Sequence, residues 1–312
     1  MLIRPTVEAD LDRVRTVTMT EPVGWIPPER YRDELAQRMY RPEWTWIAEE
    51  GDRIRARAVW WGRPDSARPL ALDCLWVDET ISETAILAAQ VLEAGHRWFA
   101  GQGAVSPPAF NITLANHWHA DPLAEAAMAW RRAAAAAVGL GHEVERLRFE
   151  WTPPAGVPEP TGRLTFRSEP DDETMLEVFR RIAVGSLDDE TGKNVARLGL
   201  DRAVREELQY YREAPGERSW WRTAHTGDGA LAGLAIPSAT RYHRNVGYLG
   251  VVPERRGQGY VDEILGEITR IHAAADAEKV TATTDLGNAP MAAAFHRAGY
   301  RNTETRVIFS AP

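Results

Sequence analysis

A proline- and glycine-rich segment at the midpoint of the chain constrains the fold most strongly. Residues 152–162 read TPPAGVPEPTG, with four prolines and two glycines. Proline fixes φ and lacks a backbone donor, so this run excludes a continuous helix or a central strand. It predicts a semi-extended linker between two folded parts. The length of 312 residues, about twice that of a typical domain, agrees with two domains.

The two flanking halves repeat the same order of sequence signals. Each opens with a short strand and an acid-capped helix, at 2–10 in the first half and 164–172 in the second. Each later carries an apolar strand that runs into a helix, ALDCLWV in the first half and VGYLGVV in the second. A duplicated α/β unit explains both of these sequence similarities. We therefore predict tandem α/β domains at 1–151 and 163–312, each a mixed central sheet flanked by helices.

The halves differ at the turn that follows the apolar strand. In the first half this turn is Asp78–Thr84, with three acids and no glycine. In the second half it is Pro253–Val261, PERRGQGYV, in which Gly257 and Gly259 leave room for backbone amides to converge on phosphate oxygens. The following helix N-terminus adds a partial positive charge, and one of the two arginines adds a full one. The pattern indicates a pyrophosphate-binding turn, with an ordinary exposed glycine turn as the alternative.

The same turn resembles the motif Arg/Gln-x-x-Gly-x-Gly/Ala of the GNAT superfamily of N-acetyltransferases. Arg256-Gly257-Gln258-Gly259-Tyr260-Val261 matches the motif at its first and fourth positions, with Val261 in place of the usual final Gly/Ala. Downstream, NAPMAAAFHRAGY from Asn288 resembles the asparagine-containing helix of the family and its closing Gly-aromatic pair. The resemblance covers 163–312 and, more loosely, the first half. It implies a tandem GNAT chain with a degenerate first half.

The resemblance implies that acetyl-CoA is the acyl donor and that the second half binds it. Strand backbone pairs with the pantetheine arm beside a splayed fifth strand at 280–284, and the turn amides hold the pyrophosphate. The cofactor-binding residues implied in this way are Leu249, Gly250, Val251, Val252, Arg256, Gly257, Gln258, Gly259, Tyr260, Val261, Asn288 and Phe295.

Two catalytic residues of the family have no counterpart in this sequence. The glutamate base falls near Asn245, and the tyrosine acid falls at Phe295. We take Tyr248, on the strand, and Asp189, in the acidic run 188–190, as candidate catalytic residues. Three alternatives stay open: the acidic run is only a solvated turn, water carries the proton, or the domain binds acyl-CoA without turnover.

The function that follows is an acyl-CoA-dependent N-acetyltransferase acting on the primary amine of a small molecule. Direct transfer in a ternary complex is expected, because no nucleophile for an acyl-enzyme is evident. Other acyl-CoA chemistry on the same scaffold and a non-catalytic acyl-CoA-binding or interaction module are the alternatives. The first half is expected to be structural or to shape the acceptor cleft.

Composition limits the remaining partners. A net charge of −8 argues against nucleic acid and anionic membranes. The lone Cys74 excludes an internal disulfide and is expected to be a small buried hydrophobe. The His117–Asp121 cluster lacks a third ligand, so no metal is expected. Without a visible signal peptide or membrane span, we expect a soluble, cytoplasmic protein that is a monomer or a homodimer.

Overall fold

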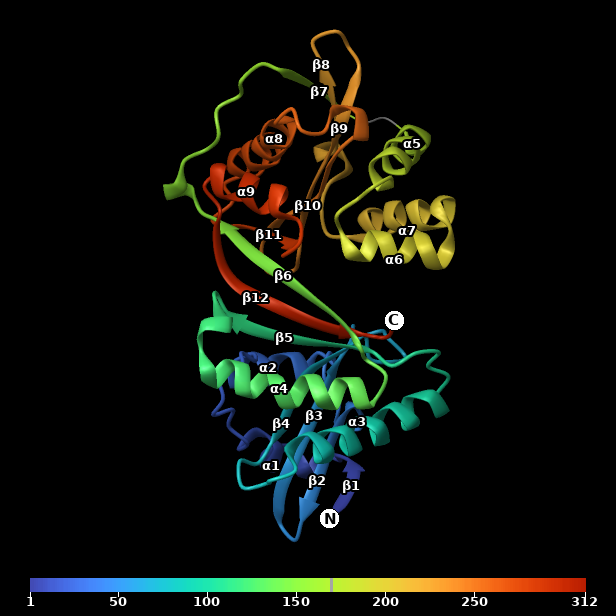
Figure 1. Ribbon diagram of the computed structural model, residues 1–312, viewed down its shortest axis with the longest axis vertical. Helices are drawn as coiled ribbons and strands as arrows, with labels where there is room; N and C mark the ends of the chain where they lie inside the picture. The colour runs from blue at the N-terminus through green and yellow to red at the C-terminus, as the bar shows by residue number, and fades with distance from the viewer. Residues whose placement is uncertain (169–170) are drawn as a thin grey trace. The chain divides into compact units, whose positions relative to one another are not determined.

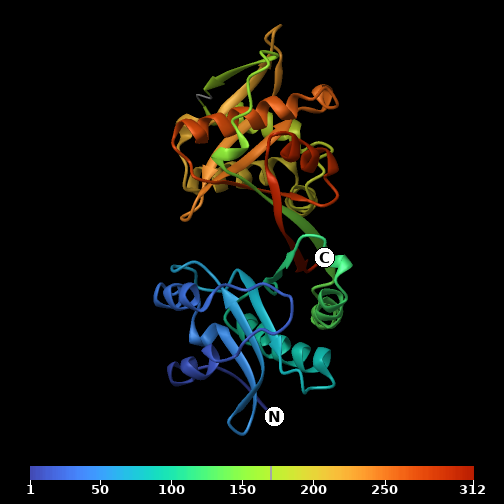
Figure 2. The same ribbon diagram turned by 90° about the vertical axis from the view of Figure 1, so that its left-hand side faces the viewer.

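The computed structural model describes residues 1–168 and 171–312, which form two compact units. Unit 1 comprises Met1–Glu145 with Glu304–Pro312, and unit 2 comprises Arg146–Thr303. In each unit, helices cover both faces of one mixed sheet (Figures 1 and 2).

Unit 1 has the strand order β1-β2-β3-β4-β5-β12, in which only the pair β4 and β5 is parallel. Helices α3 and α4 cover one face, and α1 and α2 cover the other (Figure 2). The strands are β1 (Leu2–Pro5), β2 (Thr45–Glu50), β3 (Arg53–Trp61), β4 (Ala71–Val77), β5 (Ala109–Ala115) and β12 (Arg301–Ser310). The helices are α1 (Leu11–Arg15), α2 (Pro28–Ala36), α3 (Thr84–Gly101) and α4 (Pro122–Ala137).

Unit 2 has the order β6-β11-β10-β9-β8-β7, with β10 and β11 parallel. Helices α8 and α9 lie on one face of this sheet, and α5, α6 and α7 lie on the other (Figure 1). The strands are β6 (His142–Trp151), β7 (Leu164–Ser168), β8 (Arg222–Thr226), β9 (Leu231–Ala239), β10 (Arg244–Val251) and β11 (Val280–Asp285). The helices are α5 (Asp172–Ala183), α6 (Asp189–Leu198), α7 (Leu200–Glu213), α8 (Tyr260–Ala274) and α9 (Ala289–Arg297).

The apolar spacing on α5 shows why these segments form the elements they do. Met175, Phe179 and Ile182 are three or four residues apart, and all three are buried against the sheet. Asp171 precedes the helix, and its carboxylate accepts a hydrogen bond from the backbone N–H of Thr174 at 2.7 Å. The acid-capped helix expected from the sequence of the second half is confirmed, and its apolar face packs on the sheet.

The closing strands of the two halves are exchanged. In unit 1, residues Glu304–Phe309 of β12 pair antiparallel with β5, although β12 ends the second half of the sequence. In unit 2, residues Arg146–Trp151 of β6 pair antiparallel with β11, although β6 ends the first half. The compact units therefore differ from the predicted domains 1–151 and 163–312 by these two strands. Each closing strand has the same place in a repeated unit, so the open edge of either sheet accepts it.

The linker is mostly exposed, and the lone cysteine is buried. Residues 152–162 form neither a strand nor an α-helix and are mostly exposed. Cys74 is buried in unit 1, as expected. Within the described part of the chain, no helix combines the length and the apolar character needed to span a bilayer.

Candidate functional site

The central feature of unit 2 is the divergence of β10 from β11. Within the described residues, their parallel ladder has only two pairs, Arg244 with Val280 and Asn245 with Thr281. Against β9, the register of β10 shifts between Asn245 and Tyr248, which marks a bulge. Gly247 has a φ of +68° in this bulge, and a Cβ there would lie 2.3 Å from a backbone oxygen of β9. Beyond Asn245, β10 has no described pair with β11, so this edge of β10 lacks a strand partner, although the Val251 oxygen accepts from the Arg256 guanidinium at 3.1 Å and the Val252 N–H donates to Ala232 at 3.0 Å.

The glycine turn at the end of β10 has the geometry of an anion cradle. Gly257 and Gly259 both have a φ of +75°, which L side chains rarely adopt. Helix α8 begins at Gly259 without a side-chain cap, whereas α4, α5, α6 and α9 are each capped by an Asp or Asn side chain. A Cβ on Gly257 would meet no atom within 4 Å. The approach to Gly257 is therefore open beside the N-terminus of α8, where a phosphate would be favoured.

The two arginines of the turn have partners within the protein. The guanidinium of Arg256 donates to the backbone oxygens of Ile182 at 2.7 Å and of Val184 and Gly185 at 2.9 Å. Arg255 lies 3.8 Å from the carboxylate of Asp228. We expected one arginine to add a full positive charge to the cradle. Instead, Arg256 binds the end of α5, and Arg255 lies next to Asp228. The backbone amides and the helix dipole remain as the groups of the cradle that face outward.

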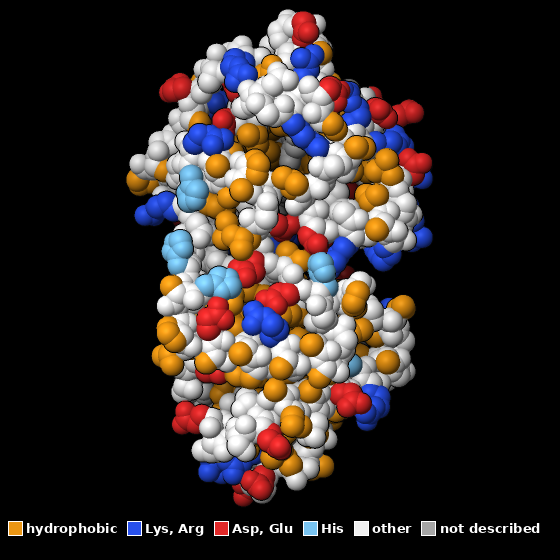
Figure 3. All heavy atoms as spheres, viewed as in Figure 1, with side chains coloured by type: hydrophobic (Ala, Val, Ile, Leu, Met, Phe, Trp, Pro, Cys, Tyr) orange, Lys and Arg blue, Asp and Glu red, His pale blue; other side chains and the backbone are white. Residues whose placement is uncertain are grey.

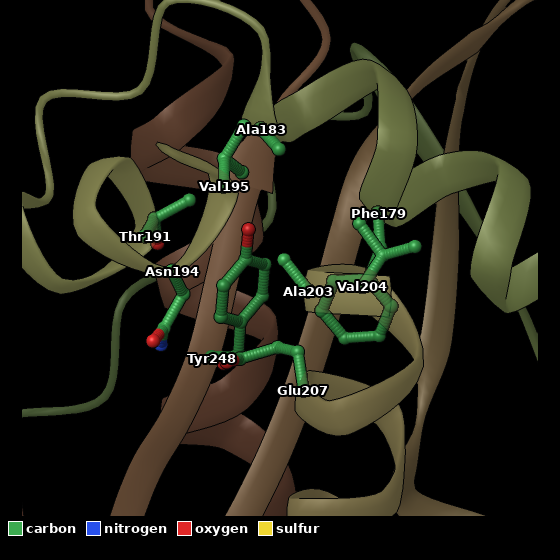
Figure 4. A pocket seen from close by; sticks show the side chains of 9 residues that line it. All are labelled: Phe179, Ala183, Thr191, Asn194, Val195, Ala203, Val204, Glu207 and Tyr248. Carbon is green, nitrogen blue, oxygen red and sulfur yellow. The ribbon is translucent and has the colours of Figure 1, made fainter. Parts of the chain in front are cut away.

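A pocket opens next to the bulge, between β10 and the helices α5, α6 and α7 (Figure 4). The ring of Tyr248 stands in it, and the carboxylate of Glu207, from α7, lies beside that ring. Phe179 meets the Tyr248 ring edge-on, with 4.9 Å between centroids. The lining residues are Phe179, Ala183, Thr191, Asn194, Val195, Ala203, Val204, Glu207 and Tyr248.

The electrostatics of the pocket distinguish its two titratable groups. Burial, reinforced by the negative charges of Glu190 and Asp188, raises the pKa of Glu207 from 4.5 to about 7. Burial and the nearby Glu207 carboxylate raise the pKa of Tyr248 well above 10. Near neutral pH, Glu207 can therefore gain or lose a proton, whereas the Tyr248 phenol keeps its proton.

Glu207 was not predicted from the sequence as a site residue, although the residue pattern of α7 indicates it. Ala203, Val204 and Leu208 form the buried face of α7, and Glu207 has the same helical spacing. Its neighbour Glu206 is exposed and forms an ion pair with Arg202 at 2.9 Å. A carboxylate on the apolar side of an amphipathic helix is the pattern that could have indicated it.

The predicted catalytic residues have different environments. Tyr248 lines the pocket, as expected of a residue in the cleft. Asp189 does not line it: its backbone N–H donates to the Asp285 carboxylate at 2.7 Å, and its own carboxylate lies 3.6 Å from the Lys193 ammonium. The preceding Asp188 caps α6. The acidic run therefore acts on the pocket through its charge, while Glu207 supplies the carboxylate inside.

The remaining predicted cofactor residues lie along one path in unit 2. Gln258 accepts a hydrogen bond from Arg163 at 2.7 Å through its backbone oxygen, and Tyr260 packs its ring under the same guanidinium. Val261 lies in the first turn of α8 and packs against the core. Asn288 caps α9 by accepting from the Met291 N–H at 3.4 Å.

Phe295 differs from the other predicted cofactor residues because it belongs to the core. Only 2% of it is exposed, and its ring stacks on Phe149 with 4.9 Å between centroids. Asn245, the other position that lacks the catalytic group of the family, has a buried side-chain oxygen with no hydrogen-bond partner among the described residues. Neither side chain can exchange a proton near neutral pH.

No protein-family model and no curated protein matches the sequence, but solved structures resemble the whole chain. A GCN5-related N-acetyltransferase from Sphaerobacter thermophilus has a TM-score of 0.58 at 15% identity, over 98% of this chain and 94% of that one. The GCN5-related glucosamine N-acetyltransferase region of a fungal multi-domain GH3 β-N-acetylglucosaminidase has a TM-score of 0.53 at 13% identity, over 98% of this chain and 38% of that one. The chain has the GNAT fold. Both units build the helix-flanked mixed sheet, so the tandem GNAT architecture expected from the sequence is confirmed.

Unit 1 has the same diverging strands, but another segment of the chain fills the space between them. Its parallel ladder also has only two described pairs, Ala71 with Ala109 and Leu72 with Phe110. Beyond them, the Gly24 N–H donates to the Thr113 oxygen of β5 at 2.8 Å, in an isolated antiparallel bridge. The buried Arg131 anchors this segment through Glu21 at 2.5 Å. The chain itself thus pairs with β5 where β4 and β5 diverge; β5 is the counterpart of β11, whereas the edge that stays open in unit 2 is that of β10.

Within residues 1–168 and 171–312, no group of three or more His, Cys, Asp or Glu side chains is placed to hold a metal ion. Acidic and basic side chains are interspersed over the face drawn in Figure 3. His119, from the cluster examined in the sequence, lies between the carboxylates of Glu125 at 2.7 Å and Glu145 at 2.9 Å.

Proposed function

We propose that the protein is an N-acetyltransferase that moves an acetyl group from acetyl-CoA to the primary amine of a small molecule. The observation that carries this proposal is the arrangement along β10. The glycine cradle, the open strand edge and the pocket with a half-buried carboxylate follow one another along this strand and the turn that ends it. A donor bound along the edge would bring its acyl end toward the carboxylate.

The donor side is built from backbone more than from side chains. The amides around Gly257 and Gly259 would hold the pyrophosphate, since a Cβ on Gly257 would meet no atom within 4 Å, while one on Gly259 would lie 3.6 Å from the Arg163 guanidinium and 3.9 Å from the Asp262 carboxylate. The edge of β10 at 249–252 would pair with the amide groups of the pantetheine arm. Acetyl-CoA supplies the activated thioester, and the fixed backbone supplies its orientation.

On the acceptor side, Glu207 is the group suited to take the proton of an ammonium. The amine nitrogen must lose a proton before it attacks the thioester carbon, and a carboxylate with a pKa of about 7 accepts it near neutral pH. A C–N bond then forms, the C–S bond breaks, and the nitrogen releases its second proton to solvent as the amide forms. Protonated Glu207 is acidic enough to return the proton to the leaving thiolate, because an ordinary thiol has a pKa of about 8.5.

Tyr248 has a positioning role in this scheme. Its raised pKa makes it too weak an acid to protonate a thiolate and keeps it from acting as a base near neutral pH. Its phenol is still a hydrogen-bond donor in the pocket. Direct transfer is supported further because the lone Cys74 is buried in unit 1, away from any role as an acyl carrier here.

The test of the donor site is a thermal-shift and calorimetric titration with acetyl-CoA on wild type and Gly259→Asp. The substitution adds a negative charge at the cradle and a side chain at a φ of +75°, so we expect acetyl-CoA binding to weaken at least about tenfold. Gly139→Asp is the matched control: Gly139 is exposed with a φ of +83° and lies in unit 1. Equal affinity in wild type and Gly259→Asp would overturn the donor site.

Turnover separates the proposal from its alternatives. Acetylated amine together with free CoA would support the transferase. Free CoA without any acylated amine would favour other acyl-CoA chemistry, and saturable binding without turnover would favour a non-catalytic acyl-CoA-binding module. Size-exclusion chromatography with and without acetyl-CoA tests whether the protein forms a homodimer, and an electrophoretic shift assay tests the expected lack of nucleic-acid binding.

A further inference from the structure

Arg146 is a residue of the first half of the sequence that lies in unit 2. It belongs to β6 and stands opposite Asp285 of β11 in the antiparallel ladder. Its guanidinium lies 2.9 Å from the Asp285 carboxylate, 3.3 Å from that of Asp188 and 3.7 Å from that of Glu190. One cation from the first half therefore holds three carboxylates of the second.

These contacts hold the first turn of α6. Asp188 caps the helix by accepting from the Thr191 N–H at 2.8 Å and from the Thr191 hydroxyl at 2.7 Å. Asp285 accepts from the Asp189 N–H at 2.7 Å. Because Thr191 lines the pocket, a short series of contacts leads from Arg146 through Asp188 to the pocket wall.

Helix α6 depends on such polar contacts more than the other two helices of its face do. The structure describes all ten of its residues, and none of them is buried. By contrast, α5 buries four residues and α7 buries three. Since burial of apolar surface is what usually fixes a helix on a sheet, the place of α6 is set largely by the contacts of its first turn.

The pocket tolerates little movement of this wall. Its volume of about 20 Å³ has room for about one water molecule, so only the reacting nitrogen of an amine could enter it. A displacement of about 1 Å can change the rate of a positioned reaction about a hundredfold. The contacts that hold α6 thus bear on how an amine would meet Glu207.

The groups that face Glu207 come from each element around it. Asp188 and Glu190, at the start of α6, act on its carboxylate through their negative charge. The phenols are those of Tyr211 on α7 and Tyr248 on β10, and burial raises the pKa of both, so they stay neutral. The α5 side chains that line the pocket are apolar. The acids of α6 are therefore the charges that a movement of this helix would take away from Glu207.

Loss of the Arg146 charge would leave its three carboxylates facing one another. The Asp285 side chain is only 8% exposed, so water screens its charge poorly. Repulsion would act on α6, in which no residue is buried. We expect the first turn of α6 to leave β11 and to open the pocket to water.

We propose that Arg146 is a positioning residue of the acceptor site, which holds the three carboxylates together and so keeps the α6 wall beside Glu207. Through β6, the first half of the sequence thereby completes the site of the second. This inference rests on the proposed function, in which Glu207 takes the proton of the amine.

The test follows the proton affinity of Glu207 in the full chain and needs no acceptor. The melting temperature of Glu207→Gln minus that of its parent is measured from pH 4 to pH 9 in the wild-type and Arg146→Ala backgrounds. In the wild-type background this difference rises with pH, because only the parent loses the stability that accompanies a raised pKa. In the Arg146→Ala background we expect the rise to shrink to less than half, because α6 moves away and water reaches Glu207.

Matched variants separate positioning from a general loss of stability, which would lower the melting temperature without changing the rise. Arg202→Ala removes an exposed ion pair with Glu206, at 2.9 Å on α7, and should keep the full rise. Arg146→Lys keeps the charge and should keep more than half of the rise. Arg146→Met keeps the stem of the side chain without the charge, and it replaces Arg146→Ala if that variant does not fold.

Turnover connects the result to the proposed function. Spermidine and 2-phenylethylamine serve as probe amines at saturating acetyl-CoA. Arg146→Ala should lower kcat at least about tenfold. Binding of acetyl-CoA, followed by calorimetry, should stay as in wild type, because the ion pairs of Arg146 are to α6, its N-cap Asp188 and β11.

The two proposals fail in different ways. An undiminished or larger rise in the Arg146→Ala background would show that α6 stays in place, and it would overturn the positioning role. Wild-type kcat in Arg146→Ala, or a flat difference in the wild-type background, would overturn it as well. If no amine is acetylated, the transferase is overturned, while a reduced rise still supports the positioning role.

Discussion

At the scale of single residues, Glu207 is the clearest case of a property created by folding. In an unfolded chain, its carboxyl would titrate near 4.5, like any other glutamate. On α7 it is partly withdrawn from water and faces the charges of Glu190 and Asp188, and its pKa rises to about 7. The proton affinity of the folded state therefore exceeds that of the unfolded state between these two values.

This difference makes the stability of the protein depend on pH in a predictable direction. Because the pKa of Glu207 is raised on folding, its contribution is fully present below about pH 4.5 and is lost as the pH rises to about 7. Glu207→Gln does not titrate, so its melting temperature relative to wild type should rise across this window by about 3 °C and then stay level. Thermal melts from pH 4 to pH 9 check this. Glu206→Gln should show no such trend, and parallel curves for Glu207→Gln and wild type would contradict the assignment.

At the scale of elements, the space beside the diverging strands differs between the two units. In unit 2, the edge of β10 beyond Asn245 is open, and a glycine turn follows it. In unit 1, Gly24 forms a β-bridge with Thr113 of β5. The turn after β4 contains Asp78, whose carboxylate accepts hydrogen bonds from the Thr80 hydroxyl at 2.7 Å and from the Thr80 backbone N–H at 2.9 Å. An acidic turn and a filled edge leave no place for an anionic, extended ligand.

We therefore expect one acetyl-CoA site in each chain. Isothermal titration calorimetry should give a stoichiometry near one, and Gly259→Asp should remove the whole of the signal, because unit 1 has no second cradle. A stoichiometry near two, or half of the heat remaining in Gly259→Asp, would show that the segment around Gly24 leaves the edge when the ligand binds.

Arg256 also belongs to the element scale, since it connects the cradle to the pocket. Its hydrogen bonds to Ile182, Val184 and Gly185 tie the glycine turn to the end of α5, one of the three helices that line the pocket. The arginine of the motif is thus used to hold two parts of the site together through backbone oxygens.

At the scale of the whole molecule, the exchange of closing strands determines how the chain responds to cleavage. The linker 152–162 is mostly exposed and can accept a protease site, for example at Glu159. After cleavage, the first fragment still contributes β6 to unit 2, and the second still contributes β12 to unit 1. We expect the two fragments to co-elute at the mass of the intact chain and to separate only in denaturant.

Size-exclusion chromatography in native buffer and in urea checks this. A chain that stops after Thr303 is the complementary variant, since it removes the β12 segment that pairs with β5 and should destabilise unit 1. Fragments that separate in native buffer would contradict the exchange.

The sequence by itself determined the features that depend on neighbouring residues. Proline marks the linker, helical spacing gives α5, and Gly257 and Gly259 give the turn, because backbone conformation and amphipathic spacing are local. Only the tertiary structure decided the pocket, the raised pKa of Glu207, the filled edge at Gly24 and the exchange of β6 and β12. Each of these depends on segments distant in sequence, where burial, charge and strand pairing are set by which partners meet.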